Sequence, residues 1–369
     1  KIRFKMKDQK KILFIIDHLK GGGAEIMTLN LAKKLQERGY EIHILLLENH
    51  NNFKNRTESF YLYNLDTPSG FVGGKLLIDK PLNQETIKRL NSLILEIKPS
   101  NIIITIWYAF LILPYIKHEN ILTWFQADLL PPSKKTYNPI KFLRNHYKNI
   151  IFKRKFISLF SNKKIITLNQ DLKEKYASLL NNPDIQVIPN GIPQPLDLSS
   201  LEKEWDICFV GRLSPSKQVE HAIIAFSNSI LTGRMVIVGE GPRRSKLEKL
   251  SRKQGILDRI DFIGWVNNTE TYIKKSKLLI LPSLTEGYPL VIGESLQNKT
   301  PVIAYNCSEG VASQFYTDDM KRGLVQLNDI HALELAMNDL IKEPYSIPED
   351  IYLRYSLDTM ADRFIKLLD

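Results

Sequence analysis

The sequence is poor in the residues that build disulfide frameworks and metal centres. Only two cysteines occur in 369 residues, Cys208 in a predicted strand and Cys307 in a predicted loop. No Cys-x-x-Cys pair and no cluster of cysteine with histidine is present, which excludes a disulfide scaffold and a zinc site. There is also no Asp-x-Asp pair to hold a divalent metal. We therefore expect neither a metal nor another cofactor.

Long apolar runs are absent as well. No run approaches the roughly 18–20 residues that a membrane-spanning helix needs. The apolar run Ile12–Ile16 near the N-terminus is too short for a signal peptide, and a strand-then-helix pattern follows it. We therefore expect a cytoplasmic protein.

Length and periodicity indicate two α/β domains. A chain of 369 residues is long enough for two hydrophobic cores. Predicted strands alternate with predicted helices along most of it, which is typical of parallel sheets covered by helices on both faces. The stretch Pro189–Pro195 is rich in proline and carries no charge, which indicates a hinge. We predict an N-terminal domain at 1–190, a linker at 191–204, a C-terminal domain at 205–345 and a terminal segment at 346–369.

The first βαβ unit contains a glycine-rich turn. A buried strand is predicted at Lys11–Ile16 and a helix from about Ala24 to Arg38, with three glycines at 21–23 between them. Glycines allow close approach of the backbone to a ligand, and the amides at the start of the helix favour an anion. The alternative is a flexible loop without a ligand. The spacing is not Gly-x-Gly-x-x-Gly, which argues against NAD binding.

A second strand-to-helix loop carries two glutamates. The apolar segment Leu278–Pro282 predicts a buried strand, and Pro289 suits the first position of a following helix. Glu286 then lies at the carboxyl end of a strand, where open α/β sheets bind ligands. Glu294 lies about one and a half turns inside the helix and can face the same crevice. The alternative is that both glutamates are ordinary surface residues.

The residues around these glutamates resemble the motifs of a known protein family. Glu286-Gly-Tyr-Pro-Leu290, then Glu294, then Thr-Pro-Val-Ile-Ala at 300–304, resemble the nucleotide-sugar site of the family 4 retaining glycosyltransferases. The resemblance implies the GT-B fold, in which two doubly wound Rossmann-like α/β domains face each other across a cleft. It also implies that the terminal helix crosses back to the first domain.

The resemblance assigns roles to the residues that match the family motifs. The first glutamate would hold the donor sugar and the second the ribose hydroxyls. Arg212 and Lys217, in Gly-Arg-Leu-Ser-Pro-Ser-Lys, match the diphosphate-binding pair. The whole implied donor site is Gly22, Gly23, Arg212, Lys217, Val266, Glu286, Gly287, Tyr288, Pro289, Leu290 and Glu294. Glu286, Arg212 and Lys217 would act in catalysis.

The acceptor side departs from the family pattern. The family usually places a histidine beside the reacting carbon, whereas this chain has Gln126, with Asp128 two residues later. Glutamine donates and accepts hydrogen bonds but cannot take a proton. Either Asp128 is the catalytic group near the acceptor, or the loop is aligned differently.

Positive charge is concentrated in one segment. The formal net charge is +11, yet no acidic residue occurs between Leu129 and Gln170. Aromatic residues recur there at near-helical spacing, at Tyr137, Phe142, Tyr147, Phe152, Phe156 and Phe160. One interpretation is a helix with buried aromatic side chains and a solvated basic face. The other is attachment to an anionic membrane or to a phosphorylated glycolipid. The basic residues that would make this attachment are Lys141, Arg144, Lys148, Lys153, Arg154 and Lys155.

We therefore expect a retaining glycosyltransferase that moves a hexose or N-acetylhexosamine from a nucleotide sugar to a saccharide or lipid-linked glycan of the cell envelope. The loop Asn306–Gly310 resembles members that use UDP-sugars, which favours UDP over GDP. We expect the protein at the inner face of the plasma membrane, without nucleic acid as a partner. The alternatives are a retaining hydrolase, a sugar-nucleotide epimerase of the same fold, and a non-enzymatic basic protein that binds nucleic acid or membranes.

Overall fold

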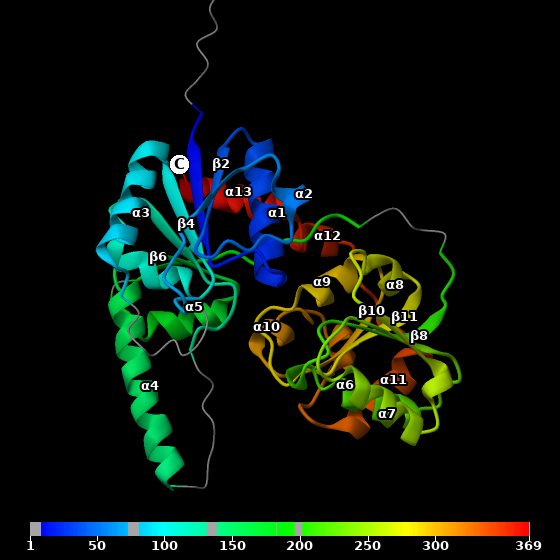
Figure 1. The fold of residues 1–369 in the computed structure, drawn as a ribbon. Coiled ribbons are helices and arrows are strands. Elements are labelled where there is room, and N and C mark those ends of the chain that lie inside the picture. The colour runs from blue at the N-terminus through cyan, green and yellow to red at the C-terminus, as the bar shows by residue number, and fades with distance from the viewer. Residues whose placement is uncertain (1–8, 73–80, 131–138, 182, 196–200, 369) are drawn as a thin grey trace, which may run out of the picture. The chain divides into compact units, whose positions relative to one another are not determined.

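The structure, a computed structural model, describes residues 9–72, 81–130, 139–181, 183–195 and 201–368 (Figure 1). Within the helix that begins at residue 139, side chains are described from residue 144. The chain divides into two compact units, Lys1–Gly191 with Leu357–Asp369, and Ile192–Ser356. We expected the return to the first domain at residue 346, whereas the division lies at Ser356. The short helix α12 (Ile351–Arg354) therefore belongs to the second unit.

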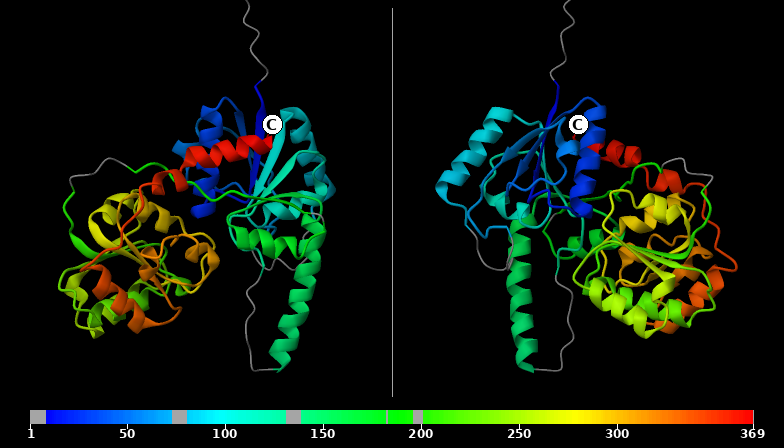
Figure 2. Two further views of the ribbon diagram at one scale, coloured as in Figure 1. Left: turned by 180° about the vertical axis from the view of Figure 1, so that it is seen from behind. Right: turned by 45° about the vertical axis from the view of Figure 1, so that its right-hand side comes forward.

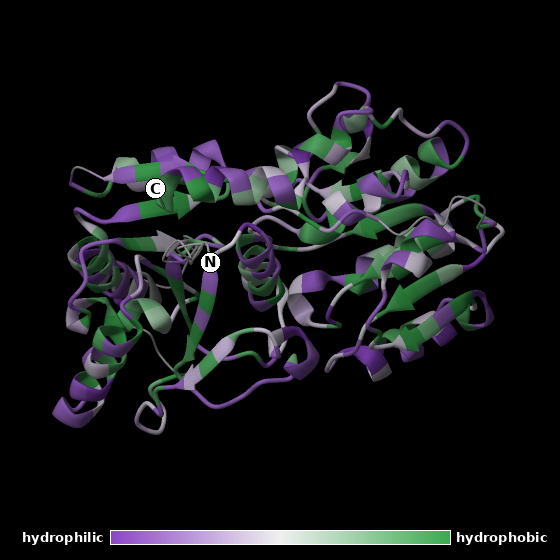
Figure 3. Cartoon of the chain, turned by 90° about the horizontal axis from the view of Figure 1, so that it is seen from above, coloured by the Kyte–Doolittle hydropathy of each residue, from purple (hydrophilic) through white to green (hydrophobic). Residues whose placement is uncertain are grey.

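The first unit is built on a parallel sheet of seven strands in the order β3-β2-β1-β4-β5-β6-β7. The strands are β1 (Lys11–Ile16), β2 (Glu41–Leu46), β3 (Tyr61–Asn64), β4 (Asn101–Thr105), β5 (Ile121–Trp124), β6 (Lys164–Thr167) and β7 (Asp184–Val187). The central strands are continuous apolar runs, as expected for strands that are covered on both faces (Figure 3).

Helices connect these strands and cover the sheet. They are α1 (Gly23–Glu37), α2 (Lys54–Thr57), α3 (Gln84–Ile97), the 3-10 helix η1 (Ala109–Tyr115), α4 (Pro139–Phe160), α5 (Gln170–Ala177) and α13 (Leu357–Leu368). The strand order reverses between β1 and β4. Because crossovers between parallel strands are right-handed, helices from the two sides of this reversal lie on opposite faces of the sheet.

The terminal helix α13 is an integral part of the first unit (Figure 2). Lys34 of α1 and Arg38, the residue after α1, both form ion pairs with Asp358, at 3.1 Å each. The ring of Phe364 packs edge-on against Trp124 of β5, with centroids 5.0 Å apart. The hydrophobic face of α13 thus completes the core over β5, and charged residues fix its first turn to α1.

The second unit is a parallel sheet of six strands in the order β10-β9-β8-β11-β12-β13. The strands are β8 (Trp205–Val210), β9 (Met235–Val238), β10 (Ile260–Gly264), β11 (Ser276–Leu281), β12 (Val302–Tyr305) and β13 (Leu324–Val325). Its remaining helices are η2 (Pro215–Lys217), α6 (Val219–Asn228), α7 (Arg244–Lys253), η3 (Leu257–Arg259), α8 (Glu270–Lys274), α9 (Leu290–Gln297), α10 (Glu309–Ala312), η4 (Met320–Gly323) and α11 (Ile330–Leu340). Here the strand order reverses between β8 and β11.

Each unit is thus a doubly wound α/β sheet, as predicted from the alternation of strands and helices. One local prediction was wrong. Pro289 is the residue before α9, with φ −69° and ψ 117°, and the first helical residue is Leu290. The ring of Pro289 fixes only φ, and its ψ is extended, as at many helix N-caps.

Candidate active site

The reversal of strand order in the second unit brings together two loops that carry predicted site residues. Open α/β sheets bind ligands beyond the carboxyl ends of their strands at such a point. The loop after β8 contains Arg212 and Lys217, and the loop after β11 contains Glu286. The two loops are joined by a hydrogen bond from the Leu284 amide to the Ser216 carbonyl, 2.8 Å.

Close packing of glycines fixes the neighbouring loop as well. A Cβ atom on Gly239 would lie 2.0 Å from the Gly211 carbonyl oxygen, and one on Gly241 would lie 2.4 Å from that of Leu213. Both glycines also have positive φ, 138° and 159°. The loop after β9 therefore supports the loop after β8 from behind, through contacts that only glycine allows.

Lys217 and Glu286 form an ion pair at this edge. Lys217 Nζ lies 2.5 Å from Glu286 Oε1, and the two side chains are only 24% and 11% exposed. The sequence predicted that these residues share a site, and the structure brings their charged groups into contact. The pair neutralises both charges across the reversal point.

Arg212 contributes an exposed cation in the same loop. Its guanidinium makes no hydrogen bond or ion pair with any residue that the structure describes. A guanidinium binds phosphate oxygens through two parallel N–H donors, which suits an anion at this edge of the sheet.

Glu294 lies on α9, four residues after the helix begins. Burial and, to a smaller extent, the charge of Glu270 raise the pKa of its carboxyl to about 7. Within the described parts of the chain, no hydrogen-bond donor reaches this carboxylate. A carboxylate placed in this way can accept hydrogen bonds from ligand hydroxyl groups.

The start of α9 offers backbone donors. The amides of Tyr288 and Leu290 make no hydrogen bond to any described residue, as expected at a helix N-terminus. Gly310 lies directly against this loop, because a Cβ atom on Gly310 would lie 1.6 Å from the Gly287 carbonyl oxygen. The loop Gly287–Leu290 is thus held rigidly, with its amides available to an anion.

Val266 lies two residues after β10 ends, at the same edge of the sheet as the loops after β8 and β11. Only its backbone was predicted to take part in binding. It lies beside Trp265, whose side chain is 70% exposed.

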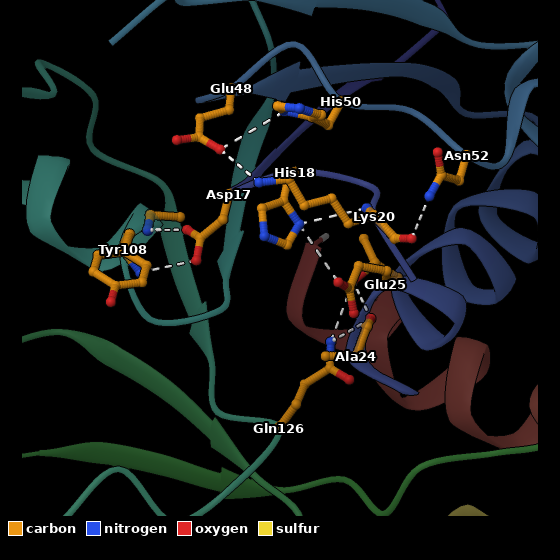
Figure 4. A network of polar contacts seen from close by, with 12 residues as sticks. Asp17, His18, Lys20, Ala24, Glu25, Glu48, His50, Asn52, Tyr108 and Gln126 are labelled. Carbon is orange, nitrogen blue, oxygen red and sulfur yellow. Dashed lines mark hydrogen bonds and ion pairs between the residues drawn. The ribbon is translucent and has the colours of Figure 1, made fainter. Parts of the chain in front are cut away.

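The reversal point of the first unit is organised around a residue that the sequence did not single out, Asp17 (Figure 4). Asp17 follows β1, is 2% exposed, and accepts hydrogen bonds from the amides of Tyr108 and Ala109, at 3.1 and 2.5 Å. Burial raises the pKa of this carboxyl to about 7. The signal in the sequence was a carboxylate at the end of a buried strand.

The two amides belong to a strained turn. Ile106, just after β4, has φ 70°, which is unfavourable for a β-branched residue. Asp17 holds the residues that follow Ile106 and so stabilises this turn across the reversal point.

The predicted glycine-rich loop lies next to Asp17. Gly22 precedes α1, and a Cβ atom on it would lie 2.5 Å from Glu25 Oε2. Glu25 is buried, and its other oxygen lies 3.6 Å from His18 Nδ1. The positive end of α1, at Gly22 and Gly23, is therefore already faced by a carboxylate of the chain.

Gln126, predicted on the acceptor side, connects three elements of the first unit (Figure 4). Its amide nitrogen donates to Thr105 Oγ1 at 2.9 Å, and to the Ala24 carbonyl and Thr28 Oγ1 at 3.2 Å each. Its oxygen Oε1 is buried without a hydrogen-bond partner among the described residues. Gln126 thus fixes the first turn of α1 to β4 and keeps one acceptor unused.

Asp128 is engaged by the helix α5. Its carboxylate accepts hydrogen bonds from Lys175 Nζ at 2.5 Å, from Tyr176 Oη at 2.9 Å and from the Leu130 amide at 3.0 Å. These contacts anchor the loop after β5 to α5.

The basic helix α4 has buried aromatic side chains at one end and exposed basic side chains along it. Its C-terminal half packs into the core, because Phe156 and Phe160 are 3% and 2% exposed. Its N-terminal half extends away from the sheet (Figures 1 and 2), and Tyr147 there is 66% exposed. Four of the predicted basic residues are exposed and a fifth, Lys155, is half-buried: Arg144, Lys148, Lys153, Arg154 and Lys155. The Lys141 side chain lies outside the described residues.

In the described ranges, no three His, Cys, Asp or Glu side chains gather in a group that could hold a metal ion. None of the described helices is both long and apolar enough to cross a membrane.

Two protein-family models match the chain in succession. Residues 21–194 match the model described as Glycosyltransferase Family 4. Residues 196–354 match the model described as Glycosyl transferases group 1. The first match lies within the first unit except for its last three residues, and the second lies within the second unit.

Relatives and solved structures agree with these matches. An uncharacterized glycosyltransferase of Haemophilus influenzae is 25% identical over 354 residues, 94% of this chain and 93% of that protein. The UDP-Gal:α-D-GlcNAc-diphosphoundecaprenol α-1,3-galactosyltransferase of Escherichia coli is 27% identical over 222 residues, 53% of this chain and 56% of that enzyme. HepE of Anabaena, solved with UDP and glucose, has a TM-score of 0.75 at 17% identity and covers 98% of this chain and 99% of its own. This structural likeness confirms the predicted GT-B fold.

Proposed function

This chain belongs to glycosyltransferase family 4 and is a retaining glycosyltransferase. On that premise we propose that it transfers a hexose or N-acetylhexosamine from a UDP-sugar to a cell-envelope glycan. Membership of the family sets aside the hydrolase, the epimerase and the non-enzymatic alternatives. The observation that carries the proposal is the convergence of Arg212, Lys217 and Glu286 at the reversal point of the second sheet.

The cations of the second unit would stabilise the departing nucleotide diphosphate. As the bond to the sugar breaks, negative charge develops on the diphosphate, and Arg212, Lys217 and the amides at the start of α9 face that charge. Preorganised donors of this kind are worth about 3–4 kcal/mol each in known enzymes. We also assign the backbone amides of the Gly22–Gly23 loop to donor binding.

The glutamates would recognise the neutral parts of the donor. Glu294 carries a carboxylate without a hydrogen-bond donor among the described residues, which suits it to the ribose hydroxyls. Glu286 would accept hydrogen bonds from hydroxyls of the transferred sugar once Lys217 has turned to the diphosphate. The backbone at Val266 would contact the base. UDP is favoured because HepE was solved with UDP and the E. coli relative is named for UDP-Gal.

The first unit would supply the acceptor side. The unused oxygen of Gln126 can accept a hydrogen bond from a sugar hydroxyl, whereas its amide nitrogen fixes α1. Asp128, held by Lys175 and Tyr176, would shape the acceptor loop rather than remove a proton. The acceptor hydroxyl would then attack from the face that the nucleotide leaves, and a phosphate oxygen would take its proton.

We assign a lipid-linked acceptor at an anionic membrane surface, which places the protein at the inner face of the plasma membrane. The exposed side chains Tyr147, Ile150 and Ile151 accompany the cations along α4. Apolar side chains among cations are typical of helices that lie on anionic membranes. The E. coli relative is named for a diphosphoundecaprenol-linked acceptor.

Calorimetric titration with UDP and with GDP tests the donor site. We expect UDP to bind, and Glu294→Ala to weaken binding by about 1–3 kcal/mol, the loss typical of a charged hydrogen bond. The control is Glu248→Ala, because Glu248 is a half-buried glutamate on α7 that pairs with Arg244. If neither nucleotide binds the wild-type protein, the donor-site assignment is wrong.

Vesicle sedimentation tests the membrane contact. We expect binding to vesicles with anionic lipid, weakened by salt and by charge reversal at Lys148 and Arg154. Reversal of Lys246 and Lys249 on the exposed face of α7 is the matched control. Equal loss from both pairs of substitutions would show only a general charge effect, and stronger binding to DNA than to vesicles would contradict the assignment.

A further inference from the structure

Gln314 is a fully buried polar residue that the reaction described above does not use. It is 0% exposed and lies just after α10. Its amide nitrogen donates to the Gly310 carbonyl at 2.9 Å and, more weakly, to the Pro289 carbonyl at 3.4 Å. Its oxygen accepts a hydrogen bond from Tyr355 Oη at 2.9 Å. A buried amide with all its groups engaged specifies one arrangement of its neighbours.

Two of these neighbours belong to the donor loop. Pro289 is the residue before α9, and Gly310 packs directly on the Gly287 carbonyl. The hydroxyl of Tyr288 is hydrogen-bonded to Tyr355 as well. Gln314 and Tyr355 therefore fix the loop Gly287–Pro289, whose amides face the proposed diphosphate.

Tyr355 also contacts the segments where the chain enters and leaves the second unit. The unit begins at Ile192 and ends at Ser356. The Ile192 amide donates to the Tyr355 carbonyl at 2.8 Å, and Ile192 and Ser356 form a parallel bridge. The entry and exit segments are thus held side by side, through the backbone of Tyr355.

The helix α9 rests on both of these segments at Gly293. A Cβ atom on Gly293 would lie 2.7 Å from a ring carbon of Tyr355 and 3.1 Å from Ile192 Cδ1. Gly293 directly precedes Glu294, the residue assigned to the ribose. The helix that contacts the nucleotide therefore has direct contact with the entry and exit segments.

We propose that Gln314 and Tyr355 are positioning residues for sugar transfer, which couple the nucleotide-bound state of the donor loop to the segments that connect the two units. Binding of the diphosphate to the amides of the donor loop stabilises one arrangement of that loop. The hydrogen bonds of Gln314 and Tyr355 transmit this arrangement to Ile192 and Ser356. The inference rests on the proposed donor site, because the nucleotide must bind at α9.

Hydrogen–deuterium exchange of the full chain, with and without UDP, tests the coupling. The Ile192 amide is a direct reporter, because its only hydrogen bond among the described residues is to Tyr355. In the wild type we expect UDP to slow exchange both in a peptide covering Gly287–Leu290 and in one covering Ile192, by about fivefold or more. In Tyr355→Phe, we expect the protection at Gly287–Leu290 to remain and that at Ile192 to be lost.

Steady-state kinetics provide the second measurement. We expect Tyr355→Phe to lower kcat by about tenfold while the KM for the donor changes by less than about twofold, because the ring and its packing on Gly293 are kept. The control is Tyr345→Phe, which removes a buried hydroxyl bonded to the backbone of Val302 and not to the donor loop. Gln314→Leu is the second variant, and its soluble, folded fraction should reproduce the loss of coupling.

The outcomes separate this inference from the proposed function. If UDP protects neither peptide in the wild type, the donor-site assignment fails. If UDP protects Gly287–Leu290 but not the Ile192 peptide, the donor site stands and the coupling is wrong. Equal effects of Tyr355→Phe and Tyr345→Phe on kcat would reduce Tyr355 to a purely structural residue.

Discussion

The two sheets reverse their strand order in the same manner, between β1 and β4 and between β8 and β11, yet opposite charges surround the two reversal points. The first is mainly acidic: Glu25 and Glu48 pair with His18 and Lys20, and Asp17 accepts hydrogen bonds from backbone amides. The second offers the cations Arg212 and Lys217, with Glu286 paired to Lys217. The same fold therefore presents a cluster of loops at each reversal point, and the cationic side chains make the second the better match for an anionic diphosphate.

The difference between the two reversal points is tested most directly by removing one lysine from each. We expect Lys217→Ala to lower kcat by about 10²- to 10³-fold, the loss typical of one preorganised donor to a developing oxyanion. Lys20 forms an ion pair with Glu48 at 2.9 Å in the first unit. We expect Lys20→Ala to lower kcat by less than about threefold, because an exposed ion pair contributes little. Similar losses in both variants, measured by transfer from UDP-sugar, would contradict the division of roles.

A second prediction concerns the buried carboxylate of the first unit. The pKa of Asp17 is raised from 3.8 to about 7, so between these values the folded state binds a proton that the unfolded state has released. The free energy of unfolding should therefore fall as pH rises from about 4 to about 7, and should level off above pH 7. In Asp17→Asn this pH-dependent contribution is absent.

Urea titrations of both proteins at pH 5 and pH 8 measure the effect. We expect the stability difference between wild type and Asp17→Asn to shift against the wild type by about 1–3 kcal/mol over this range. The variant keeps one oxygen and can accept from only one of the Tyr108 and Ala109 amides. That loss is the same at both pH values, so the change of the difference with pH isolates the titration. An identical pH profile in the two proteins would mean that Asp17 titrates normally.

The same contrast explains how much of the molecule could be predicted from its sequence. The strand Lys11–Ile16 was predicted with correct limits, because the core of a buried parallel strand is an apolar run. The second reversal point was predicted because Arg212, Lys217 and Glu286 carry a recognisable motif. Motif and spacing do not show which of these side chains pair with one another. An example is the contact of Lys217 with Glu286, 69 positions away.

The first reversal point could not be predicted in the same way. Asp17 acquires its role from amides 91 and 92 positions later in the chain. Asp128 likewise acquires its partners from α5, 47 and 48 positions later. An isolated carboxylate gives no indication of such partners, because they depend on which strands become neighbours in the sheet. The prediction of Pro289 as a helical residue failed for a local reason, since proline fixes φ but leaves ψ open.

The smallest expected effect tests whether the Lys217–Glu286 pair competes with the donor. Glu286 neutralises Lys217, so a diphosphate must separate this pair before it gains the full attraction of Lys217. Glu286→Gln keeps the shape of the side chain and removes its charge. We expect this variant to bind UDP about three- to tenfold more tightly than the wild type. The reason is that the negative charge of Glu286 repels an anion and neutralises Lys217.

The variant should at the same time transfer sugar more slowly, since UDP carries no sugar for Glu286 to hold whereas the complete donor does. Calorimetry with UDP and a transfer assay with the UDP-sugar measure the two effects separately. Glu240→Gln is the control, because Glu240 also pairs with a cation, Arg244, and lies in the loop after β9. Weaker binding of UDP to Glu286→Gln would show that Glu286 positions Lys217 for the phosphate instead of competing with it, and the ion pair would then be part of the binding-competent state.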